Sequence, residues 1–245
     1  MTTLPPITIT ITTYASDDLQ GVQRTKAARQ AWRSWATYLR YDGELRVHVA
    51  DDGSERRGYN EAWWRKVQVS CPLGSLTYSR QDRGGVGASL NAGWRQAIAD
   101  GALALYPVDD WQLLGPLDLT PWAELILDHP EGPAGVRLGP PHPGMTGTVE
   151  HWENRWFLRP DRHHFVFAQR PALFDPVRMT LAYGWHDEGI NALECERLYN
   201  ERYCGIMPGA APDVVLALLH PWDHIYTTSL SDADPTTRLA AGGAA

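Results

Sequence analysis

Two pairs of adjacent acids each follow an apolar segment of the sequence. Asp51 and Asp52 come directly after residues 45–50, and Asp109 and Asp110 come shortly after a second such segment. Both segments are typical of buried β-strands, so the acids are expected at the carboxyl edge of an α/β sheet, where such sheets bind ligands. Carboxylates gathered at one edge are costly unless they meet water, a metal ion or a polar ligand. The sequence therefore predicts a ligand site at this edge.

Strand and helix signals alternate along the first part of the chain. Alternating Ile and Thr predict the first strand at residues 7–12. Further signals predict strands at 45–50, 75–79 and 102–106 and helices at 19–39, 59–67 and 88–99. This alternation is typical of an α/β fold with a mostly parallel sheet and right-handed crossovers. Such a sheet brings both acidic pairs to one edge.

The second half of the sequence is less regular. Thr120 and Pro121 are typical of a helix start, with Thr as the N-cap and Pro as the first helical residue. Other signals predict a strand at 135–138, a loop at 139–148, paired strands at 156–158 and 165–167, and a helix at 188–203. No linker divides the chain, so we expect one domain at residues 1–228 and a disordered tail at 229–245.

The overall charge narrows the range of partners. The chain has 245 residues, is 43% apolar and carries a formal net charge of -7, as expected for one large acidic domain. A broad basic face for a nucleic-acid backbone is therefore disfavoured. A local basic cleft is still compatible with this charge, because the helix predicted at 19–39 carries four cations: Arg24, Lys26, Arg29 and Arg33. A solvated helix face is the simpler interpretation of these residues.

Cysteine usage and hydropathy indicate the compartment. Cys71, Cys195 and Cys204 lack Cys-x-x-Cys spacing, which favours free thiols over a disulfide frame or a zinc site. The sequence has no signal-peptide pattern, and no apolar run approaches the roughly 20 residues that a membrane span needs. We therefore expect a cytoplasmic protein, in the host cytoplasm if it is viral, with no membrane partner.

Four motifs at predicted strand ends carry a resemblance to a known family. They are Thr12-Thr13-Tyr14, Asp51-Asp52-Gly53-Ser54, Arg83-Gly84-Gly85 with Asn91, and Val108-Asp109-Asp110. In this order they resemble GT-A glycosyltransferases of the family 2-like type. The resemblance implies a Rossmann-like, mostly parallel sheet flanked by helices, with a nucleotide-sugar half at 1–115 and an acceptor half at 116–228. Residues 108–121 also resemble glycosyltransferases of bacteriophages, some of which are associated with modified pyrimidines in DNA.

The resemblance implies donor-binding roles for the residues at these strand ends. Thr13, Tyr14 and Asp51 would border the nucleobase, and Arg83 would offset phosphate charge. The full set of expected donor residues is Thr13, Tyr14, Asp51, Asp52, Gly53, Arg83, Gly84, Asn91 and Asp109. Simpler interpretations stay open: a plain turn at residues 51–54, a flexible turn at 84–87, and an exposed helix position at residue 91.

The resemblance also implies a divalent cation, Mn²⁺ or Mg²⁺, that neutralises the diphosphate leaving group. Asp110 takes the metal role, Asp109 faces the sugar or ribose, and His220 or His224 supplies a further ligand. Val108 stands where the family's Asp-x-Asp motif has its first acid. The alternatives are a capped strand end with solvated acids, and histidines with structural roles.

Asp187 and Glu188 lie in a segment that resembles the acceptor-side motif of the same fold. An acid there commonly accepts the proton of the attacking acceptor hydroxyl in inverting transfer. We favour Glu188 over Asp187 as this base. The alternative is that both acids belong to the first turn of a helix, where the macrodipole favours negative charge.

The sequence thus predicts an inverting, metal-assisted glycosyltransferase with a nucleotide sugar as donor, most commonly a UDP sugar in this family. The phage-like segment suggests 5-hydroxymethylcytosine or a related pyrimidine in DNA as the acceptor. A protein or glycan acceptor is the alternative, as is a non-catalytic module that binds a nucleotide sugar. A sugar nucleotidyltransferase is disfavoured because residues 12–18 contain no basic, Gly-rich loop.

Overall fold

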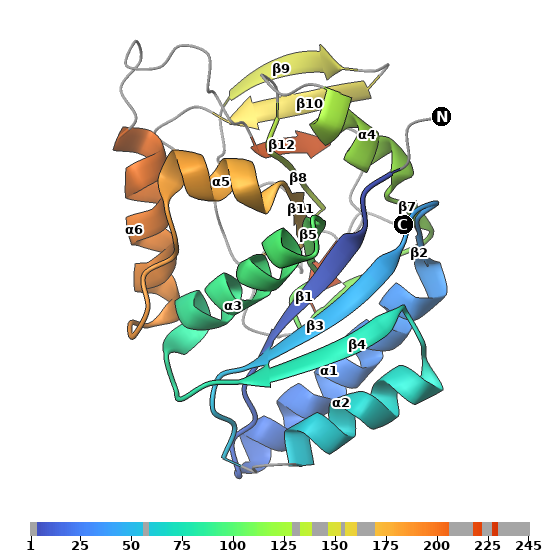
Figure 1. The fold of residues 1–245 in the computed structure, drawn as a ribbon, viewed down its shortest axis with the longest axis vertical. Helices are drawn as coiled ribbons and strands as arrows, with labels where there is room; N and C mark the ends of the chain where they lie inside the picture. The colour runs from blue at the N-terminus through green and yellow to red at the C-terminus, as the bar shows by residue number, and fades with distance from the viewer. Residues whose placement is uncertain are drawn as a thin grey trace, which may run out of the picture.

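The computed structural model describes residues 4–55, 59–128, 133–138, 147–152, 155–160, 170–205, 218–221 and 227–229. Within these ranges the chain forms a nine-stranded sheet of order β4-β3-β1-β5-β11-β8-β12-β10-β9 (Figure 1). Its strands are β1 (Ile7–Thr13), β3 (Leu45–Asp51), β4 (Ser75–Arg80), β5 (Leu103–Tyr106), β8 (Gly135–Arg137), β9 (Gly147–Trp152), β10 (Arg155–Pro160), β11 (Ala172–Phe174) and β12 (Leu218–Pro221). Two short ladders pair β2 (Leu39–Arg40) with β7 (Leu117–Asp118), and β6 (Trp111–Leu113) with β13 (Thr227–Ser229).

The strands β4, β3, β1 and β5 are parallel and form one half of the sheet. The chain moves outward from β1 to β3 and β4, and then returns to place β5 on the other side of β1. The order of strands therefore reverses between β1 and β5, and the crevice beyond their carboxyl ends is the expected ligand site of an open α/β sheet. The predicted fold class is confirmed.

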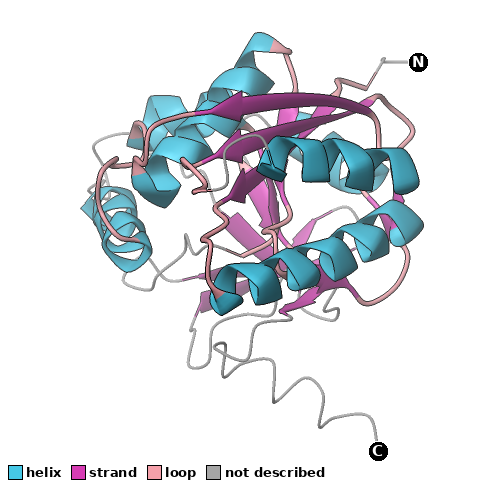
Figure 2. Cartoon of the chain, turned by 90° about the horizontal axis from the view of Figure 1, so that it is seen from below, coloured by secondary structure: helices cyan, strands magenta, loops and turns pink. Residues whose placement is uncertain are grey.

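Helices cover both faces of this sheet (Figure 2). The described helices are α1 (Leu19–Tyr38), α2 (Tyr59–Ser70), α3 (Gly85–Ala99), α4 (Thr120–Asp128), α5 (Pro176–Tyr183) and α6 (Ala192–Gly205). Every residue of β1 is buried because both faces are covered. Its Ile residues join the core under α1 and α2. Thr8, Thr10 and Thr12 alternate with them and face α3, where a Cβ on Gly93 would lie 2.7 Å from the Cβ of Thr10, so the helix packs directly on the strand.

Tertiary contacts shift several predicted boundaries. The helix expected at 88–99 begins at Gly85, because the carboxylate of Asp52 accepts the backbone N–H groups of Gly84 and Gly85. Thr120 is the first helical residue rather than the N-cap, and its hydroxyl accepts the N–H of Asp42. The helix expected at 188–203 begins at Ala192 and so excludes the two acids at 187–188.

The second half also differs from expectation in its strand pairing. The strand expected at 156–158 belongs to β10, which pairs with β9 and β12. Its expected partner, residues 165–167, lies outside the described residues. The first two residues of β9 were expected in the loop at 139–148. Ser229, the first residue of the expected tail, pairs with Trp111 in the β6–β13 ladder. Aromatic and β-branched residues can occupy several strand pairs, and the sequence does not select one.

In the part of the chain that the structure describes, no helix combines the length and hydropathy required to cross a bilayer.

Candidate functional site

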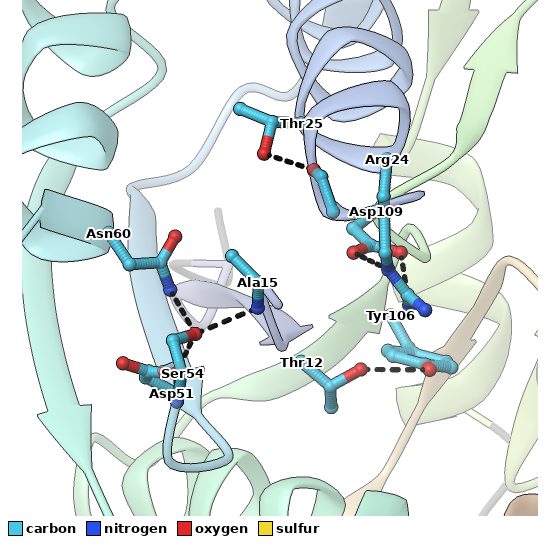
Figure 3. A network of polar contacts seen from close by, with 10 residues as sticks. Thr12, Ala15, Arg24, Thr25, Asp51, Ser54, Asn60, Tyr106 and Asp109 are labelled. Carbon is cyan, nitrogen blue, oxygen red and sulfur yellow. Dashed lines mark hydrogen bonds and ion pairs between the residues drawn. The ribbon is translucent and has the colours of Figure 1, made fainter. Parts of the chain in front are cut away.

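A cleft of about 160 Å³ opens at the carboxyl ends of β1 and β5. Hydroxyl groups line its floor, where Thr12 Oγ1 and the Tyr106 hydroxyl lie 3.1 Å apart (Figure 3). Burial raises the pKa of Tyr106, so this hydroxyl stays protonated. The lining residues come from β1, β5, the loops after β1, β3 and β5, and the first two turns of α1, α3 and α6: Thr12, Thr13, Tyr14, Arg24, Asp52, Val86, Ser89, Tyr106, Val108 and Ala192.

Asp51 is fully buried and closes the turn that follows β3 (Figure 3). Its Oδ1 accepts the Ser54 N–H at 2.9 Å and the Ser54 hydroxyl at 2.6 Å. Its Oδ2 accepts the Tyr78 hydroxyl at 2.5 Å and lies 3.3 Å from Arg80 Nη1. Burial, and next the hydrogen bond to Asp51, raise the pKa of Tyr78. Both carboxylate oxygens of Asp51 are therefore bonded within the protein.

Asp52 joins the same turn to the start of α3. It accepts the backbone N–H of Gly84 at 2.8 Å and of Gly85 at 3.1 Å, as well as the Gln81 amide at 3.2 Å. A carboxylate at a helix N-terminus is stabilised by the helix dipole and by these otherwise unsatisfied donors. Gly53 has φ 72°, and a Cβ there would come within 3.1 Å of the Arg83 backbone N. The two loops thus pack backbone against backbone.

Tyr14 and Arg83, both expected at the nucleotide, do lie together. The guanidinium of Arg83 stands 4.4 Å from the centre of the Tyr14 ring, in the geometry of a cation–π contact. The Tyr14 hydroxyl donates to Glu55 Oε1 at 2.9 Å, and this hydrogen bond raises the pKa of Tyr14. A planar cation and an aromatic ring therefore meet at the rim of the cleft.

In the second acidic pair, Asp109 forms an ion pair with Arg24, a residue expected only as one of the cations on a basic helix. Asp109 has a side chain only 2% exposed, and both of its oxygens accept from Arg24 of α1, each at 2.9 Å (Figure 3). The carboxylate raises the pKa of Arg24 further above its usual range. Asp110 beside it is half-buried. No sequence signal marks the pairing, because 85 residues separate Arg24 from Asp109.

Val108, directly before this pair, adopts φ 60°. A β-branched residue rarely occupies this left-handed region, and holding it there costs about 1–3 kcal/mol. Asn and Asp tolerate the same backbone conformation far better than Val. The strain is therefore located directly before the second acidic pair, in the loop that follows β5.

The described residues do not fit a preformed divalent-cation site. Among them, no group of three or more His, Cys, Asp or Glu is arranged to hold a metal ion. Asp109 is bonded to Arg24 through both oxygens, which leaves Asp110 as the remaining acid of the motif. His220 lies in β12, three strand positions from β5 or about 14 Å, and His224 lies outside the described residues. Since such cations take about six oxygen ligands, a ligand would have to supply most of them.

Asn91 fixes the loop that carries the candidate catalytic acids Asp187 and Glu188. It is 1% exposed, so the alternative of an exposed helix position is wrong. Its Nδ2 donates to the His186 carbonyl at 3.0 Å and to Glu188 Oε1 at 2.8 Å, and its Oδ1 accepts the His186 N–H at 2.9 Å. Asn91 thus holds both the backbone at His186 and the carboxylate of Glu188.

The glycines at 84–87 bring this loop against α3. A Cβ on Gly85 would lie 2.6 Å from the Ile190 carbonyl oxygen, and one on Gly87 would lie 2.0 Å from the Asp187 carbonyl oxygen. The N–H of Gly189 also donates to the Gly84 carbonyl at 2.6 Å. The Gly-Gly-Val-Gly segment therefore has a packing role that its sequence did not reveal: it permits close approach of a loop about 100 residues further along the chain.

Asp187 and Glu188 have different partners. The structure places both in the loop before α6, so the alternative of acids in a first helical turn is wrong. Asp187 Oδ2 lies 2.9 Å from Arg202 Nη2 of α6. Glu188 is 48% exposed, is bonded to Asn91, and has Arg95 3.5 Å away. Glu188 is thus a solvent-accessible carboxylate on a rigidly held loop, as a general base requires.

The sequence matches no protein-family model, and no curated protein matches it. Among solved structures the chain is similar to TarS of S. aureus. For a TarS fragment of residues 1–349 the TM-score is 0.58 at 15% identity, over 92% of this chain and 60% of that chain. For the same fragment in complex with UDP, the TM-score is 0.56 at 15% identity, over 91% and 59%.

TarS itself gives a TM-score of 0.59 at 16% identity, over 92% of this chain and 36% of that chain. This chain therefore spans less than two thirds of the proteins it matches. The likeness defines the class of fold: the architecture is GT-A. Nucleotide, sugar and acceptor do not follow from identities this low.

Proposed function

We propose that this protein is a glycosyltransferase that moves a sugar from a nucleotide sugar to an acceptor hydroxyl. The observation that carries the proposal is the position of Glu188: a half-exposed carboxylate, held by Asn91, on a loop that packs against the start of α3. Val86 and Ser89 of α3 also line the cleft between β1 and β5, as does Ala192, the first residue of α6 after this loop. A base and a ligand cleft thus share one wall.

The donor is a nucleotide diphosphate sugar in the cleft. Thr13 and Tyr14 border the base, and Arg83, whose guanidinium lies at the Tyr14 ring, offsets the charge of the diphosphate. Uridine is the nucleobase we favour, because the TarS structure of the same fold contains UDP. Asp51, Asp52 and Asp109 act by shaping the walls, since each carboxylate is bonded within the protein.

The reaction is a single displacement with inversion. The acceptor oxygen forms a bond to the anomeric carbon while the bond from that carbon to the diphosphate breaks, and the nucleoside diphosphate leaves with the bonding electrons. The hydroxyl proton passes to Glu188, a step that typically contributes about 10²–10⁴-fold to the rate. Asn91 orients this carboxylate, and the rest of the rate comes from holding both substrates in line.

A divalent cation, Mn²⁺ or Mg²⁺, would be held by Asp110 together with the diphosphate of the donor. When bound, it would neutralise charge on the leaving group. The displacement and the proton transfer are carried by residues of this chain, and the described ones form no cation site of their own.

The acceptor that we favour is the hydroxymethyl group of a modified pyrimidine in DNA. Support comes from the likeness of residues 108–121 to phage glycosyltransferases, while the net charge of -7 weighs against a long duplex contact. Offering 5-hydroxymethylcytosine DNA, oligosaccharides and peptides to the enzyme in parallel tests this choice. Transfer only to sugars or peptides would refute the DNA acceptor and leave the transferase intact.

The experiment that tests the function compares two neighbouring acids. We expect the wild-type protein to release UDP from UDP-sugars, slowly with water and faster with an acceptor. Glu188→Gln keeps the contact with Asn91 and should lower transfer about 10²–10⁴-fold. Asp187→Asn is the matched control, because Asp187 pairs with Arg202, and it should retain most activity. Nucleotide-sugar binding without any turnover would instead indicate a non-catalytic module.

A further inference from the structure

Helix α1 carries an unusual concentration of positive charge for an acidic protein. Its 20 residues include four cations and no acid, whereas the whole chain has a net charge of -7. Arg24 faces the cleft and pairs with Asp109. Lys26, Arg29 and Arg33 follow at spacings of three and four residues, so they share one helix face along about 10 Å.

These three cations have no acidic partner among the residues that the structure describes. All three are exposed. Most other arginines in the same ranges are compensated, as Arg65 is by Glu61 at 2.8 Å and Arg197 is by Glu194 at 2.6 Å. The face of α1 formed by Lys26, Arg29 and Arg33, the α1 basic face, is therefore an uncompensated positive stripe.

The α1 basic face borders a hollow between α1 and α2. Its volume is about 220 Å³, larger than the cleft at the sheet edge. The half-buried indole of Trp63 forms the α2 wall. Asp18 accepts the hydroxyl of the lining residue Ser16 at 2.6 Å and caps α1 by accepting the Gly21 N–H at 2.9 Å. The lining residues are Ala15, Ser16, Gly21, Val22, Thr25, Lys26, Arg29 and Trp63.

We propose that this hollow and the α1 basic face bind a single strand of nucleic acid. The phosphates contact Lys26, Arg29 and Arg33, and a base stacks against Trp63. Single-strand sites combine these two features, a positive groove along the backbone and an aromatic side chain for the bases. A concave site with an aromatic wall suits a flexible strand with bases that can stack better than it suits the flat surface of an anionic membrane.

The hollow and the cleft lie on two sides of one helical turn. Arg24 lines the cleft, and Thr25 and Lys26 line the hollow. A strand on the α1 basic face therefore passes beside the candidate catalytic site. That this strand is the sugar acceptor rests on the proposed function, whereas the binding itself does not.

Binding of a fluorescein-labelled oligothymidine of about 12 nucleotides to the full chain, followed by anisotropy, tests the proposal. For a single strand the affinity should fall with a log–log salt slope of about -0.7 per neutralised phosphate, or about -2 for three contacts. The dissociation constant should then rise about 20-fold between about 50 and 200 mM salt. Lys26→Glu or Arg29→Glu should weaken binding several-fold and reduce the slope by about 0.7.

Lys66→Glu is the matched control, because Lys66 is an exposed helical lysine on α2 that does not line the hollow. It makes the same change of charge and should leave affinity and slope unchanged. Equal losses in Lys66→Glu and Lys26→Glu would overturn the proposal, as would no binding at low salt. Displacement of the oligonucleotide by UDP, or binding to phosphatidylglycerol vesicles in its place, would also overturn it. Absence of sugar transfer would refute only the proposed function.

Discussion

Replacing Asn91 by Ala should test whether catalysis by Glu188 depends on the hydrogen bond that positions its carboxylate. Within the described part of the chain, Asn91 of α3 is bonded to both His186 and Glu188, through three hydrogen bonds of 2.8–3.0 Å. Ala preserves the helix but removes all three contacts. The backbone N–H and carbonyl of His186, a residue only 3% exposed, then lose their hydrogen bonds to Asn91.

The expected loss of stability follows from these contacts. Removing one partner of a buried hydrogen bond costs up to about 1–3 kcal/mol, and two such bonds to His186 are lost while water has partial access to the loop. We expect the free energy of unfolding to fall by about 2–4 kcal/mol. The Glu188 contact adds little to stability because this carboxylate is 48% exposed.

The effect on activity should be larger than the effect on donor binding. Displacing a base by about 1 Å can cost about 10²-fold in rate, so transfer should fall by that order while the KM for the nucleotide sugar stays nearly constant. Asn91→Asp should impair transfer similarly, because two carboxylates would then face each other. Urea unfolding and initial-rate kinetics at saturating acceptor measure both quantities.

Gln96→Ala is the matched control on the same helix, since the Gln96 amide donates to Asp100 at 3.1 Å rather than to His186 or Glu188. It should change neither stability nor rate appreciably. The reasoning would be refuted if Asn91→Ala were as active as the wild type while Glu188→Gln was inactive, because the base would then not depend on this contact. A fall in donor affinity alone would instead indicate that Asn91 binds the nucleotide sugar.

Three further outcomes follow from the structure. Arg24→Gln leaves the buried Asp109 carboxylate without its cation and should lower the free energy of unfolding by about 3–5 kcal/mol. Asp109→Asn leaves an arginine that is 51% exposed and should lower it by only about 1 kcal/mol. Equal losses of stability in urea unfolding would contradict this asymmetry. Burial lowers the pKa of His186 from 6.5 to about 3, so only the unfolded state gains a proton as pH falls below 6.5. The free energy of unfolding should therefore drop by about 2 kcal/mol between about pH 6.5 and pH 5, and His186→Phe should abolish that part of the slope; an unchanged slope would place the acid sensitivity elsewhere. Mn²⁺ alone should leave the melting temperature unchanged, while Mn²⁺ with UDP should raise it more than UDP alone does; Asp110→Asn should remove the difference, and a rise with Mn²⁺ alone would indicate a preformed cation site.

The helices and strands of the parallel half were predictable to within a few residues. The Ile–Thr alternation of β1 and the apolar segments of β3 and β5 are local signals, and each depends only on neighbouring residues. Prediction was weaker after Thr120, where aromatic segments could pair in several ways. β10 lies between β9 and β12, and nothing local in its sequence selects these two partners.

The candidate site was predictable in composition but not in its contacts. The acidic pairs and the Gly-rich segment were correctly placed at strand ends. Their partners were missed because they are distant in sequence: Tyr78 for Asp51, Arg24 for Asp109, and the loop at 184–191 for the glycines. A polar residue on a buried helix face, as Asn91 is, would have been the signal for a long-range contact.

The sequence by itself determined which residues reach the carboxyl edge of the sheet, because strands, turns and helix starts follow from local patterns of apolar residues, Gly and Asp. Only the tertiary structure decided which of the acids are bonded within the protein and which face solvent. Asp51, Asp52 and Asp109 are neutralised or hydrogen-bonded by neighbours, while Glu188 is held half-exposed by Asn91, 97 residues away in the sequence. The physical reason is that a carboxylate's role depends on the donors and charges within a few ångströms, and folding brings these together from distant parts of the chain.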